Sequence, residues 1–298
     1  MVKIALIYKS LLRDDFRVLS VLERAHARRE YVTLQILEKL TGFHEEKLLL
    51  VLSKLHELGL IKGETISGEK AYRLTYLGYD MLAIRALVNR NVIEAMGDKV
   101  GEGKESEIYI ALAPGNVQVA VKFLRIGRTS FRQTVRRRTW TSGLSLPWYK
   151  QSRIAAEREF KALKELSAYK AYVPTPLGYN RHVVVIEYID GLELYRKPPL
   201  KDPEAVLLMV LDTIATAYHK ASIVHGDLSE YNILVRKQDE VPFIIDWPQY
   251  VYRDDPQAVD LLKRDVSYVV KFFSKTYGVE LKINEALDYV VKWSKLNT

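Results

Sequence analysis

The feature that most constrains this chain is a polar loop enclosed by two apolar runs. Residues 223–235 read IVHGDLSEYNILV, in which Asp227 and Asn232 stand five positions apart. An aspartate can orient or accept the proton of an attacking hydroxyl or water, and an asparagine can hold Mg²⁺. An ordinary loop would seldom combine His-Gly-Asp, this gap and a subsequent apolar strand. The segment therefore predicts the catalytic loop of a phosphate-transferring enzyme.

A second acidic position occurs fourteen residues after Asn232. Residues 243–248 read FIIDWP, an apolar strand that ends in Asp246. A strand-end aspartate is ordinarily a turn former, but this order and spacing place it to coordinate Mg²⁺ across the nucleotide phosphates. We therefore predict Asn232 and Asp246 as metal ligands, and Asp227 as a catalytic residue.

A glycine pair precedes this region by more than a hundred residues. Residues 100–109 read VGEGKESEIY, so Gly101 and Gly103 lie between two apolar strand segments. Glycines let a hairpin backbone approach phosphates with its amides as donors. Ser106 stands where a third glycine is common, and its hydroxyl can contact a phosphate. A Gly-Glu-Gly turn can occur in any hairpin, so this segment is informative only in combination with the other motifs of the chain.

A lysine inside a strand supplies the next element. Lys122 lies in the alternating apolar segment VAVKF, twenty-one residues after Gly101. A lysine buried in a strand needs a negative partner, which a kinase provides as nucleotide phosphates and a helix carboxylate. An amphipathic helix expected over residues 152–166 carries two candidates for that carboxylate. We favour Glu159, with Glu157 as the alternative because the sequence does not fix the helix phase to one residue.

A third apolar strand lies between this helix and the polar loop. Residues 182–191 read HVVVIEYIDG and end in a short polar connection. The pattern resembles the hinge between the two lobes of a kinase. Backbone groups of Glu187 and Ile189 would then bind the adenine edge.

The first quarter of the chain has a different organisation. Apolar residues recur at helical spacing in three segments, and a two-stranded hairpin over residues 60–75 turns at Ser67-Gly68. The three helical segments are residues 13–28, 33–42 and 44–59. Three helices and then a hairpin are typical of a winged helix-turn-helix. A linking helix over residues 78–96 is expected next, with the domain boundary near residue 91.

The third of these helices has a mixed charge. It carries Lys47 and Lys54, but also Glu45, Glu46 and Glu57. Contact with nucleic acid through this helix and the hairpin is the favoured interpretation. A winged helix that docks on protein is the alternative.

The net charge of +8 is concentrated in one segment of the chain. Residues 108–156 hold nine basic side chains and no acidic one, so they account for more than the whole net charge. A basic patch of this kind favours a polyanionic partner, whereas a solvated loop is the simpler alternative. The nine are Lys122, Arg125, Arg128, Arg132, Arg136, Arg137, Arg138, Lys150 and Arg153.

The composition indicates the cellular compartment in which the protein works. The chain has 298 residues, 48% of them hydrophobic and 28% charged, and it contains no cysteine. Disulfides and thiolate metal sites are therefore excluded. The first residues are too short and too charged a stretch for a secretory signal, and no window of 18 uninterrupted apolar residues occurs. We expect a soluble cytoplasmic protein without a membrane partner.

Taken in order, these segments resemble the protein-kinase-like superfamily. His-Gly-Asp replaces the usual His-Arg-Asp, and Ile-Asp-Trp-Pro replaces Asp-Phe-Gly. Only 52 residues come after Asp246, without an Ala-Pro-Glu motif, so a normal activation loop and peptide-binding helices do not fit. The segments GEGKES at 101–106, HGDLSEYN at 225–232 and IDWPQ at 245–249 look like those of the RIO family of atypical kinases. The N-terminal winged helix marks the second RIO subfamily.

The resemblance implies an α+β protein in which a winged helix-turn-helix is followed by a truncated two-lobed kinase-like domain. The winged-helix domain with its connecting helix is expected over residues 1–90 and the kinase domain over 91–298. Within the latter, the N-lobe would span about 91–186 and the C-lobe about 190–298.

The same resemblance implies a serine/threonine kinase and ATPase that phosphorylates itself and acts in maturation of the small ribosomal subunit. ATP and Mg²⁺ would be required, with Mn²⁺ as an alternative metal. Ribosomal RNA would be contacted through the winged helix and the basic loop 125–153, and the protein would be a monomer. Autophosphorylation would fall on Ser130, Ser142 or Ser145.

Roles of single residues are also implied by the resemblance. Lys122, paired to Glu159, would hold the α- and β-phosphates, and Asp246 would be a second catalytic residue because relatives can carry a transient phosphoryl group there. Trp247 stands where the family more often has phenylalanine, and little functional effect is expected. The expected ATP-binding residues are Gly101, Gly103, Lys104, Glu105, Ser106, Lys122, Glu159, Glu187 and Ile189.

Three other functions fit parts of the sequence. Aminoglycoside and choline kinases share His-Gly-Asp and Ile-Asp, but they devote a large C-terminal region to their substrates, and 52 residues are too few. A nucleotide-gated assembly factor with little turnover lies close to the main interpretation. A transcription regulator with a dead kinase domain is disfavoured because Lys122, Asp227, Asn232 and Asp246 are all intact.

Overall fold

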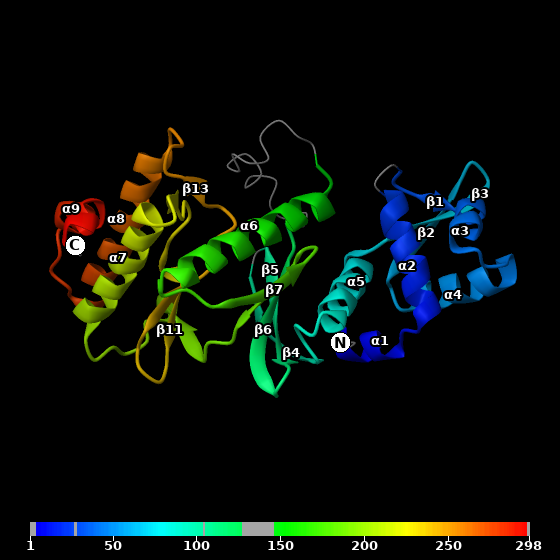
Figure 1. Cartoon of the computed structure of the whole chain (residues 1–298), viewed down its shortest axis with the longest axis horizontal. Coiled ribbons are helices and arrows are strands. Elements are labelled where there is room, and N and C mark those ends of the chain that lie inside the picture. The colour runs from blue at the N-terminus through cyan, green and yellow to red at the C-terminus, as the bar shows by residue number, and fades with distance from the viewer. Residues whose placement is uncertain (1–3, 27–28, 104, 127–145, 297–298) are drawn as a thin grey trace. The chain divides into compact units, whose positions relative to one another are not determined.

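The computed structural model describes residues 4–26, 29–103, 105–126 and 146–296 (Figure 1). Lys104, the three candidate phosphorylation serines and the five basic residues from Arg128 to Arg138 lie outside these ranges. The chain divides into two compact units. Unit 1 comprises residues 1–126 and 180–183, and unit 2 comprises 127–179 and 184–298. The division falls after Ile126, so the domain limits expected from the sequence stay predictions.

Unit 1 begins with the winged helix that the sequence predicts. Its elements are α1 (Ile4–Ser10), α2 (Arg13–His26), β1 (Val32–Thr33), α3 (Leu34–Thr41), α4 (Glu45–Glu57), β2 (Ile61–Ile66), β3 (Glu69–Leu74) and α5 (Tyr76–Asn89). Gly42 ends α3 in the left-handed conformation, with its N–H donated to the Glu38 carbonyl. Ser67 and Gly68 both have positive φ, which is the geometry of a tight hairpin turn. The three helices and the hairpin are confirmed.

Two details of this region differ from the expectation. The two-stranded hairpin has a third strand, because β1 pairs antiparallel with β3. The linking helix α5 ends at Asn89 rather than continuing to residue 96. Asn91 adopts a left-handed φ of 54°, which asparagine tolerates better than most residues, and the chain then enters β4 (Ala95–Glu102).

Unit 1 continues with an antiparallel run of strands. β4, β5 (Ser106–Ala113) and β6 (Val117–Leu124) pair in sequence order, with Ile108 opposite Lys122. The β4–β5 register shifts twice between Met96 and Gly101, so the glycine-bearing end of β4 is irregular. Strand β6 is buried over its last six residues, Lys122 among them, so both faces of this part of the strand are covered.

A buried cluster of charged side chains connects α5 to this sheet. The Arg125 guanidinium donates to both carboxylate oxygens of Asp80 on α5, at 2.6 and 2.8 Å. It also donates to Glu107 on β5 at 2.9 Å, and His182 Nε2 lies 2.7 Å from Asp80 Oδ1. Arg125 is only 4% exposed. The sequence predicts an RNA-binding loop that starts at Arg125. This prediction is wrong for Arg125, because its guanidinium is buried and paired with Asp80 and Glu107.

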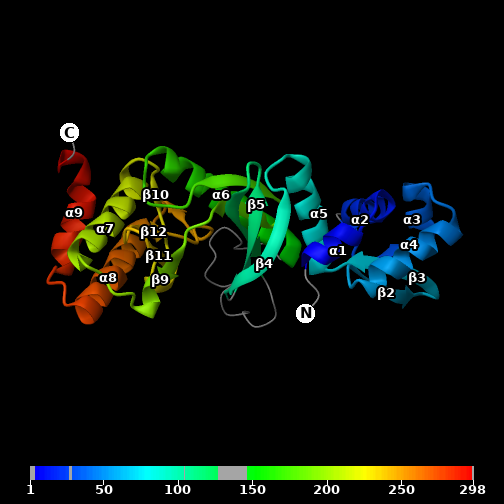
Figure 2. The same ribbon diagram turned by 90° about the horizontal axis from the view of Figure 1, so that it is seen from below.

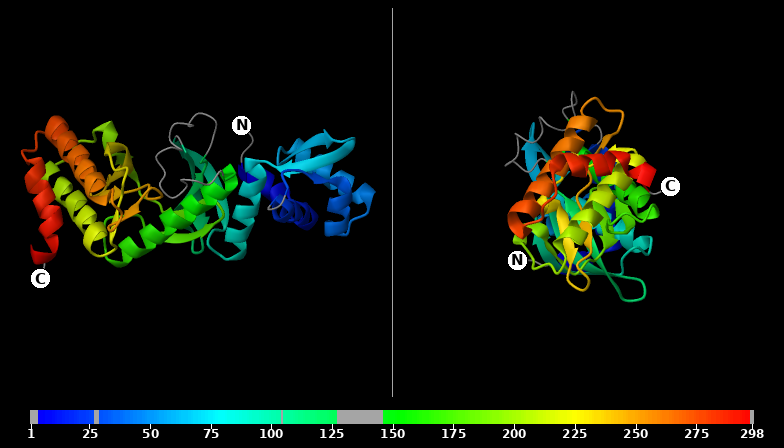
Figure 3. Two further views of the ribbon diagram at one scale, coloured as in Figure 1. Left: turned by 90° about the horizontal axis from the view of Figure 1, so that it is seen from above. Right: turned by 90° about the vertical axis from the view of Figure 1, so that its left-hand side faces the viewer.

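Unit 2 is built from a long helix, small sheets and a helical core. Helix α6 (Trp148–Ala168) starts four residues earlier than expected. The later elements are β7 (Pro176–Asn180), β8 (Val183–Glu187), β9 (Gly191–Glu193), α7 (Pro203–His219), β10 (Ile223–Val224), β11 (Ile233–Arg236), β12 (Pro242–Ile244), β13 (Val251–Tyr252), α8 (Ala258–Tyr277) and α9 (Ile283–Leu296). Helices α7, α8 and α9 lie together at the C-terminal end (Figures 2 and 3).

Short antiparallel strands hold the functional loops against this helical core. Strand β11 pairs with β12 on one side and β9 on the other, and β10 pairs with β13. The loop from β10 to β11 and the loop from β12 to β13 are therefore fixed at both ends. Among the described residues, no helix is both long and apolar enough to cross a membrane.

Candidate active site

The loop between β10 and β11 contains the predicted catalytic residue and is shaped by a buried carboxylate. Asp265 on α8 accepts the Gly226 N–H at 2.8 Å and the Leu228 N–H at 3.3 Å, and is 1% exposed. Arg264 donates to Asp265 and to the Gly226 carbonyl. Each of these backbone groups beside Asp227 is thus held by a charged partner, which makes these hydrogen bonds stronger than neutral ones.

Gly226 is required by the geometry of this loop. Its φ is +79°, and a Cβ at this position would lie 3.2 Å from the Gln249 carbonyl oxygen. Any side chain here would both strain the backbone and push against the segment that comes after Asp246. The glycine therefore lets the two polar loops approach each other.

His225 links the same two loops. The Asp227 N–H donates to His225 Nδ1 at 3.3 Å, and Nε2 lies 3.0 Å from the Ile245 carbonyl. Because Nδ1 accepts, the neutral tautomer with its proton on Nε2 satisfies both contacts. The ring also packs 4.7 Å from that of Trp247. The indole N–H of Trp247 donates to the Ile244 carbonyl, so this large side chain is buried with its polar atom satisfied.

The structure brings the predicted metal ligands to adjoining backbone segments. Asn232 donates its Nδ2 to the Asp227 carbonyl at 2.8 Å, which leaves Oδ1 as the amide atom that could bind a metal. The Ile245 N–H donates to the Asn232 carbonyl at 2.9 Å, so Asp246 comes directly after a contact with Asn232. Asp246 has a left-handed φ of 69°. An amide oxygen and a carboxylate are the ligands that Mg²⁺ prefers, so this pair fits that ion.

The electrostatics of Asp227 reflect this crowding of carboxylates. Asp227 is exposed, but neighbouring protein atoms partly desolvate it. This desolvation raises the pKa of Asp227 above its ordinary value, and the negative charge of Asp246 raises it further. His225 and Arg264 act in the opposite direction. A raised pKa makes a carboxylate a better proton acceptor near neutral pH.

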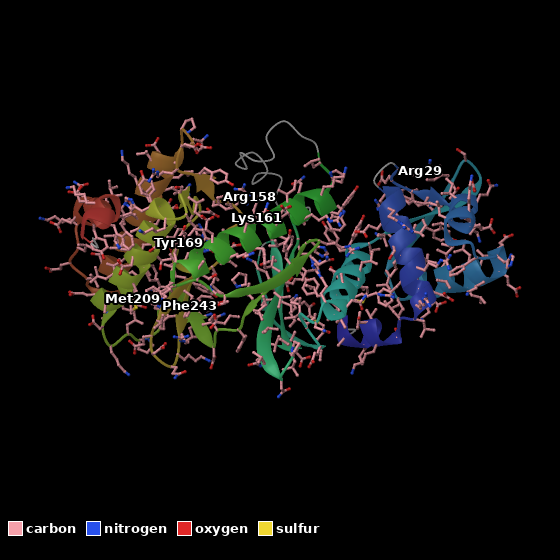
Figure 4. The ribbon with its side chains drawn as sticks, in the orientation of Figure 1. Arg29, Arg158, Lys161, Tyr169, Met209 and Phe243 are labelled. Atoms are coloured by element: carbon pink, nitrogen blue, oxygen red, sulfur yellow. The ribbon has the colours of Figure 1, made fainter. Side chains whose placement is uncertain are left out.

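Helix α6 carries a further connection to the second loop. Arg158 donates to the Pro248 carbonyl at 2.9 Å and to the Tyr250 carbonyl, and its guanidinium lies 4.0 Å from the Tyr250 ring centroid. Figure 4 labels Arg158 on this helix together with the exposed Lys161. Arg158 therefore fixes the backbone just beyond Asp246. Burial lowers the pKa of this arginine below its ordinary value.

The phase of α6 distinguishes the two candidate glutamates. Glu159 is 1% exposed, whereas Glu157 is exposed and pairs with Lys161 at 2.6 Å. A carboxylate that serves a buried lysine must itself be buried. The structure thus fixes the helix phase that the sequence left open, with Glu159 on the buried side of α6, while its pairing with Lys122 stays a prediction.

The hinge residues lie at and after the end of β8. The Glu187 N–H donates to the Thr175 carbonyl at 2.8 Å, and its carboxylate accepts the Thr175 N–H at 3.2 Å. An adenine edge would therefore use the Glu187 carbonyl and not its amide. Ile189 is buried.

The remaining predicted nucleotide residues belong to unit 1. The Gly103 N–H donates to the Ser106 carbonyl at 2.8 Å and closes the turn between β4 and β5. The Glu105 carbonyl accepts the Arg125 N–H at 2.6 Å, and Lys122 is buried within β6. Gly101 lies on β4 opposite Ile108, just past the second register shift.

Sequence reasoning missed three residues that shape the two loops, namely Arg158, Arg264 and Asp265, and it gave His225 no role within its motif. One of them left a signal, because Asp265 lies in the apolar stripe of α8 between Leu262 and Val266. A charge in such a stripe needs a buried partner. The partner is the backbone of a loop 37 to 39 residues away, which no local pattern reveals.

The fold and these loops are those of a protein-kinase-like phosphotransferase behind a winged helix. Two family models match the chain, the RIO domain over residues 107–286 and the Rio2 N-terminal domain over residues 8–90. The chain therefore belongs to the RIO family of atypical kinases, in the subfamily with the Rio2 N-terminal domain. This is a family of serine/threonine-protein kinases.

Individual relatives agree with this assignment. The serine/threonine-protein kinase rio2 of Schizosaccharomyces pombe is 35% identical over 268 residues, which cover 89% of this chain and 76% of the relative. The RIO-type serine/threonine-protein kinase Rio2 of Methanocaldococcus jannaschii is 32% identical, covering 88% of this chain and 98% of the relative. A crystal structure of the Rio2 kinase–ADP/Mg²⁺–phosphoaspartate complex from Chaetomium thermophilum is 29% identical, with a TM-score of 0.80. It covers 98% of this chain and 94% of that one.

Proposed function

We propose that this chain is a Mg²⁺-dependent ATPase and serine/threonine kinase that modifies itself and acts in maturation of the small ribosomal subunit. The observation that carries the proposal is the joint placement of Asp227, Asn232 and Asp246 on two hydrogen-bonded loops. Two acidic side chains and an amide oxygen at one place can hold a metal and manage a proton. The RIO family resemblance supplies the ribosomal role.

The residues of unit 2 have separate roles in this proposal. Asn232 Oδ1 and the Asp246 carboxylate would hold Mg²⁺, which when bound would supply positive charge to the phosphates of ATP. Asp227 orients the attacking group and accepts its proton, for which its raised pKa is suited. Asp265 and Arg264 hold Asp227 in position through the backbone. The proposed contacts to the nucleotide phosphates come from unit 1 and are Gly101, Gly103, Glu105, Ser106 and Lys122. Glu159 is proposed as the carboxylate partner of Lys122. The carbonyl of Glu187 and the backbone of Ile189 are proposed as contacts to adenine.

Asp246 has a second proposed role as a phosphoryl acceptor. Its carboxylate oxygen would form a bond to the γ-phosphorus of ATP as the bond to ADP breaks. Water would then attack this phosphorus and give a proton to Asp227 as the bond from phosphorus to Asp246 breaks, which restores the carboxylate and releases phosphate. The Chaetomium thermophilum structure is described as a phosphoaspartate complex with ADP and Mg²⁺, which supports such a step in a relative.

The decisive measurement is Mg²⁺-dependent ATP turnover with and without small ribosomal subunit particles. Turnover should be slow alone, rise with the particles, and fall by about 10²-fold or more in Asp227→Ala and also in Asp246→Ala. Asp239→Asn is a matched control, because this exposed carboxylate pairs with Arg236 in the turn between β11 and β12, at the opposite end of these strands from Asn232 and Asp246. Turnover that ignores the particles but rises with a small hydroxylated metabolite would favour a small-molecule kinase instead.

The alternative of a nucleotide-gated assembly factor has its own signature. Particle binding would depend on ATP, while turnover would stay at background even with the particles present. An acid quench and then hydroxylamine treatment test the aspartyl phosphate directly. Label from γ-phosphate-labelled ATP should be lost with hydroxylamine in the wild type and be absent from Asp246→Asn.

A further inference from the structure

The winged helix presents one strongly cationic helix face, and it is not on the helix that the sequence favours. Arg13, Arg17 and Arg24 of α2 are all exposed. Their spacing of four and seven residues places them within about 40° of one another around the helix, since each residue turns it by about 100°. The buried residues Leu19 and Leu22 lie on the opposite side of α2. The arginines therefore form a single stripe, here called the arginine face of α2.

The acidic residues of α2 do not neutralise this face, because each has another partner. Asp14 pairs with Lys47 at 2.6 Å, Asp15 with Lys54 at 2.6 Å, and Glu23 with Arg181 at 2.5 Å. Within the described part of the chain, no carboxylate forms an ion pair with any of the three arginines. The arginine face thus keeps three positive charges exposed to solvent.

Helix α4, the third helix of the motif, has the opposite character. Its two lysines are the ones that pair with Asp14 and Asp15, so their charge is already offset. Glu45, Glu46 and Glu57 of α4 are exposed. Within the described ranges, a phosphate backbone would meet the unpaired acidic side chains on α4 and the unpaired arginines on α2.

One arginine of the face is already ordered by packing. The Arg17 guanidinium lies 4.9 Å from the centroid of the Phe43 ring, in the turn between α3 and α4. A stacked guanidinium loses less side-chain entropy when it binds a phosphate. The arginine face extends over twelve residues, or about 16 Å of helix, and a duplex of that length carries on the order of five phosphates per strand.

We propose that the arginine face of α2 binds the phosphate backbone of RNA, and that α4 does not. This inference deepens the proposed function, because it rests on ribosomal RNA as the polyanion and names the surface of unit 1 that contacts it. The recognition is electrostatic and independent of base sequence, since the face offers guanidinium groups to phosphates while both lysines of α4 are already paired.

The test is the salt dependence of RNA binding by the full chain. The variant Arg13→Gln/Arg17→Gln/Arg24→Gln removes the face, and Lys39→Gln/Lys62→Gln/Lys70→Gln removes three exposed charges from α3 and the hairpin of the same unit. Binding of a mixed-sequence RNA duplex of about 20 base pairs, long enough to present several phosphates per strand, is measured by fluorescence anisotropy across a salt series. The slope of log Kd against log salt should fall by about 2 to 3 in the arginine variant. In the lysine variant it should stay within about 1 of the wild type.

Two further measurements keep the result interpretable. The variant Arg13→Lys/Arg17→Lys/Arg24→Lys keeps the charges and should retain the wild-type slope. ATP turnover without particles should be the same in all variants, so failure of the proposed enzymatic function would be seen separately from failure of this surface. An unchanged slope in the arginine variant, or an equal or larger loss in the lysine variant, would overturn the proposal. Loss of particle binding with an unchanged duplex slope would point to a protein partner and would also overturn it.

Discussion

Asp80 in unit 1 and Asp265 in unit 2 are equally buried, at 1% exposed, but they are satisfied by different kinds of partner. Asp80 binds side chains, receiving two hydrogen bonds from Arg125 and lying against His182. Asp265 binds mainly backbone, accepting two N–H groups of the loop that carries Asp227. The first arrangement fastens segments that are far apart in sequence. The second fixes the path of one loop.

The difference shows in what each carboxylate does to its neighbours. Burial by itself would raise the pKa of Asp80, but Arg125 and His182 more than offset it and bring the pKa below its ordinary value. Burial lowers the pKa of His182 below its ordinary value, although Asp80 acts in the opposite direction. The opposite charges of this cluster thus hold one another in a single buried arrangement. Around Asp265, by contrast, Asp227, the predicted catalytic carboxylate, has a raised pKa and stays exposed on the loop that Asp265 shapes.

The largest effect is expected from Arg125→Met. Removing the guanidinium leaves Asp80 and Glu107 buried without their cation, which should cost about 3–5 kcal/mol of unfolding free energy. Urea denaturation at pH 7 measures it. Arg73→Met is the matched control, because Arg73 forms an exposed pair with Glu30 and should change stability by less than about 1 kcal/mol. Equal effects of the two substitutions would contradict the structural role given to the cluster.

The second effect is expected from Asp265→Asn. The amide keeps the size of the side chain but loses the charge and turns one acceptor into a donor that faces a backbone N–H. We expect the free energy of unfolding to fall by about 1.5–3 kcal/mol. ATP turnover should fall by more than the loss of folded protein accounts for. Urea denaturation and steady-state turnover measure the two. Turnover that falls only in proportion to the folded fraction would mean that Asp265 supports the fold and not the catalytic loop.

How much of this comparison could be predicted from the sequence depends on the distance between partners. The winged helix, the strand with Lys122 and the order of the polar loops can be predicted from local periodicity and spacing. Gly42 and the Ser67-Gly68 turn also have local signatures, and the structure confirms both. Helix α5 was predicted too long, because nothing in the apolar pattern shows that Asn91 takes a left-handed conformation.

Buried charge is where sequence reasoning failed. Arg125 lies after an apolar strand and begins a basic segment, so it was grouped with the surface charges. Its partner Asp80 is 45 residues earlier and Glu107 is 18 residues earlier, and local pattern gives no pairing between them. The same limit applies to Arg158, whose acceptors are carbonyls 90 and 92 residues away. Charge counts locate a patch but do not say which of its members are exposed.

A smaller effect is expected from Arg158→Lys. Lysine keeps the positive charge but cannot donate to the Pro248 and Tyr250 carbonyls in the geometry of a guanidinium, and it loses the contact with the Tyr250 ring. Stability should fall by about 1–2 kcal/mol, and the Mg²⁺ concentration for half-maximal turnover should rise. Lys161→Met, three residues along the same helix, should leave both within error because its pair with Glu157 is exposed. An unchanged Mg²⁺ requirement in Arg158→Lys would separate Arg158 from the loop of Asp246.

The smallest effect is expected from Asp227→Asn, which should change the free energy of unfolding by an amount that depends on pH. Because the folded state raises the pKa of this carboxyl above that of the unfolded chain, its stabilising contribution is full below about 3.8 and is lost as pH rises through the folded pKa. Asp227→Asn cannot ionise, so in Mg²⁺-free buffer it should be more stable than the wild type at pH 7, by less than about 1 kcal/mol because solvent screens an exposed group. The gain in unfolding free energy should shrink as pH falls toward 4.

Asp239→Asn should behave in the opposite way, since the hydrogen bond from Arg236 lowers the pKa of Asp239. This variant should be less stable than the wild type at pH 7, and the difference should disappear on acidification. Urea denaturation at the two pH values measures both variants, and a pH-independent difference for Asp227→Asn would mean that the loop does not perturb this carboxyl.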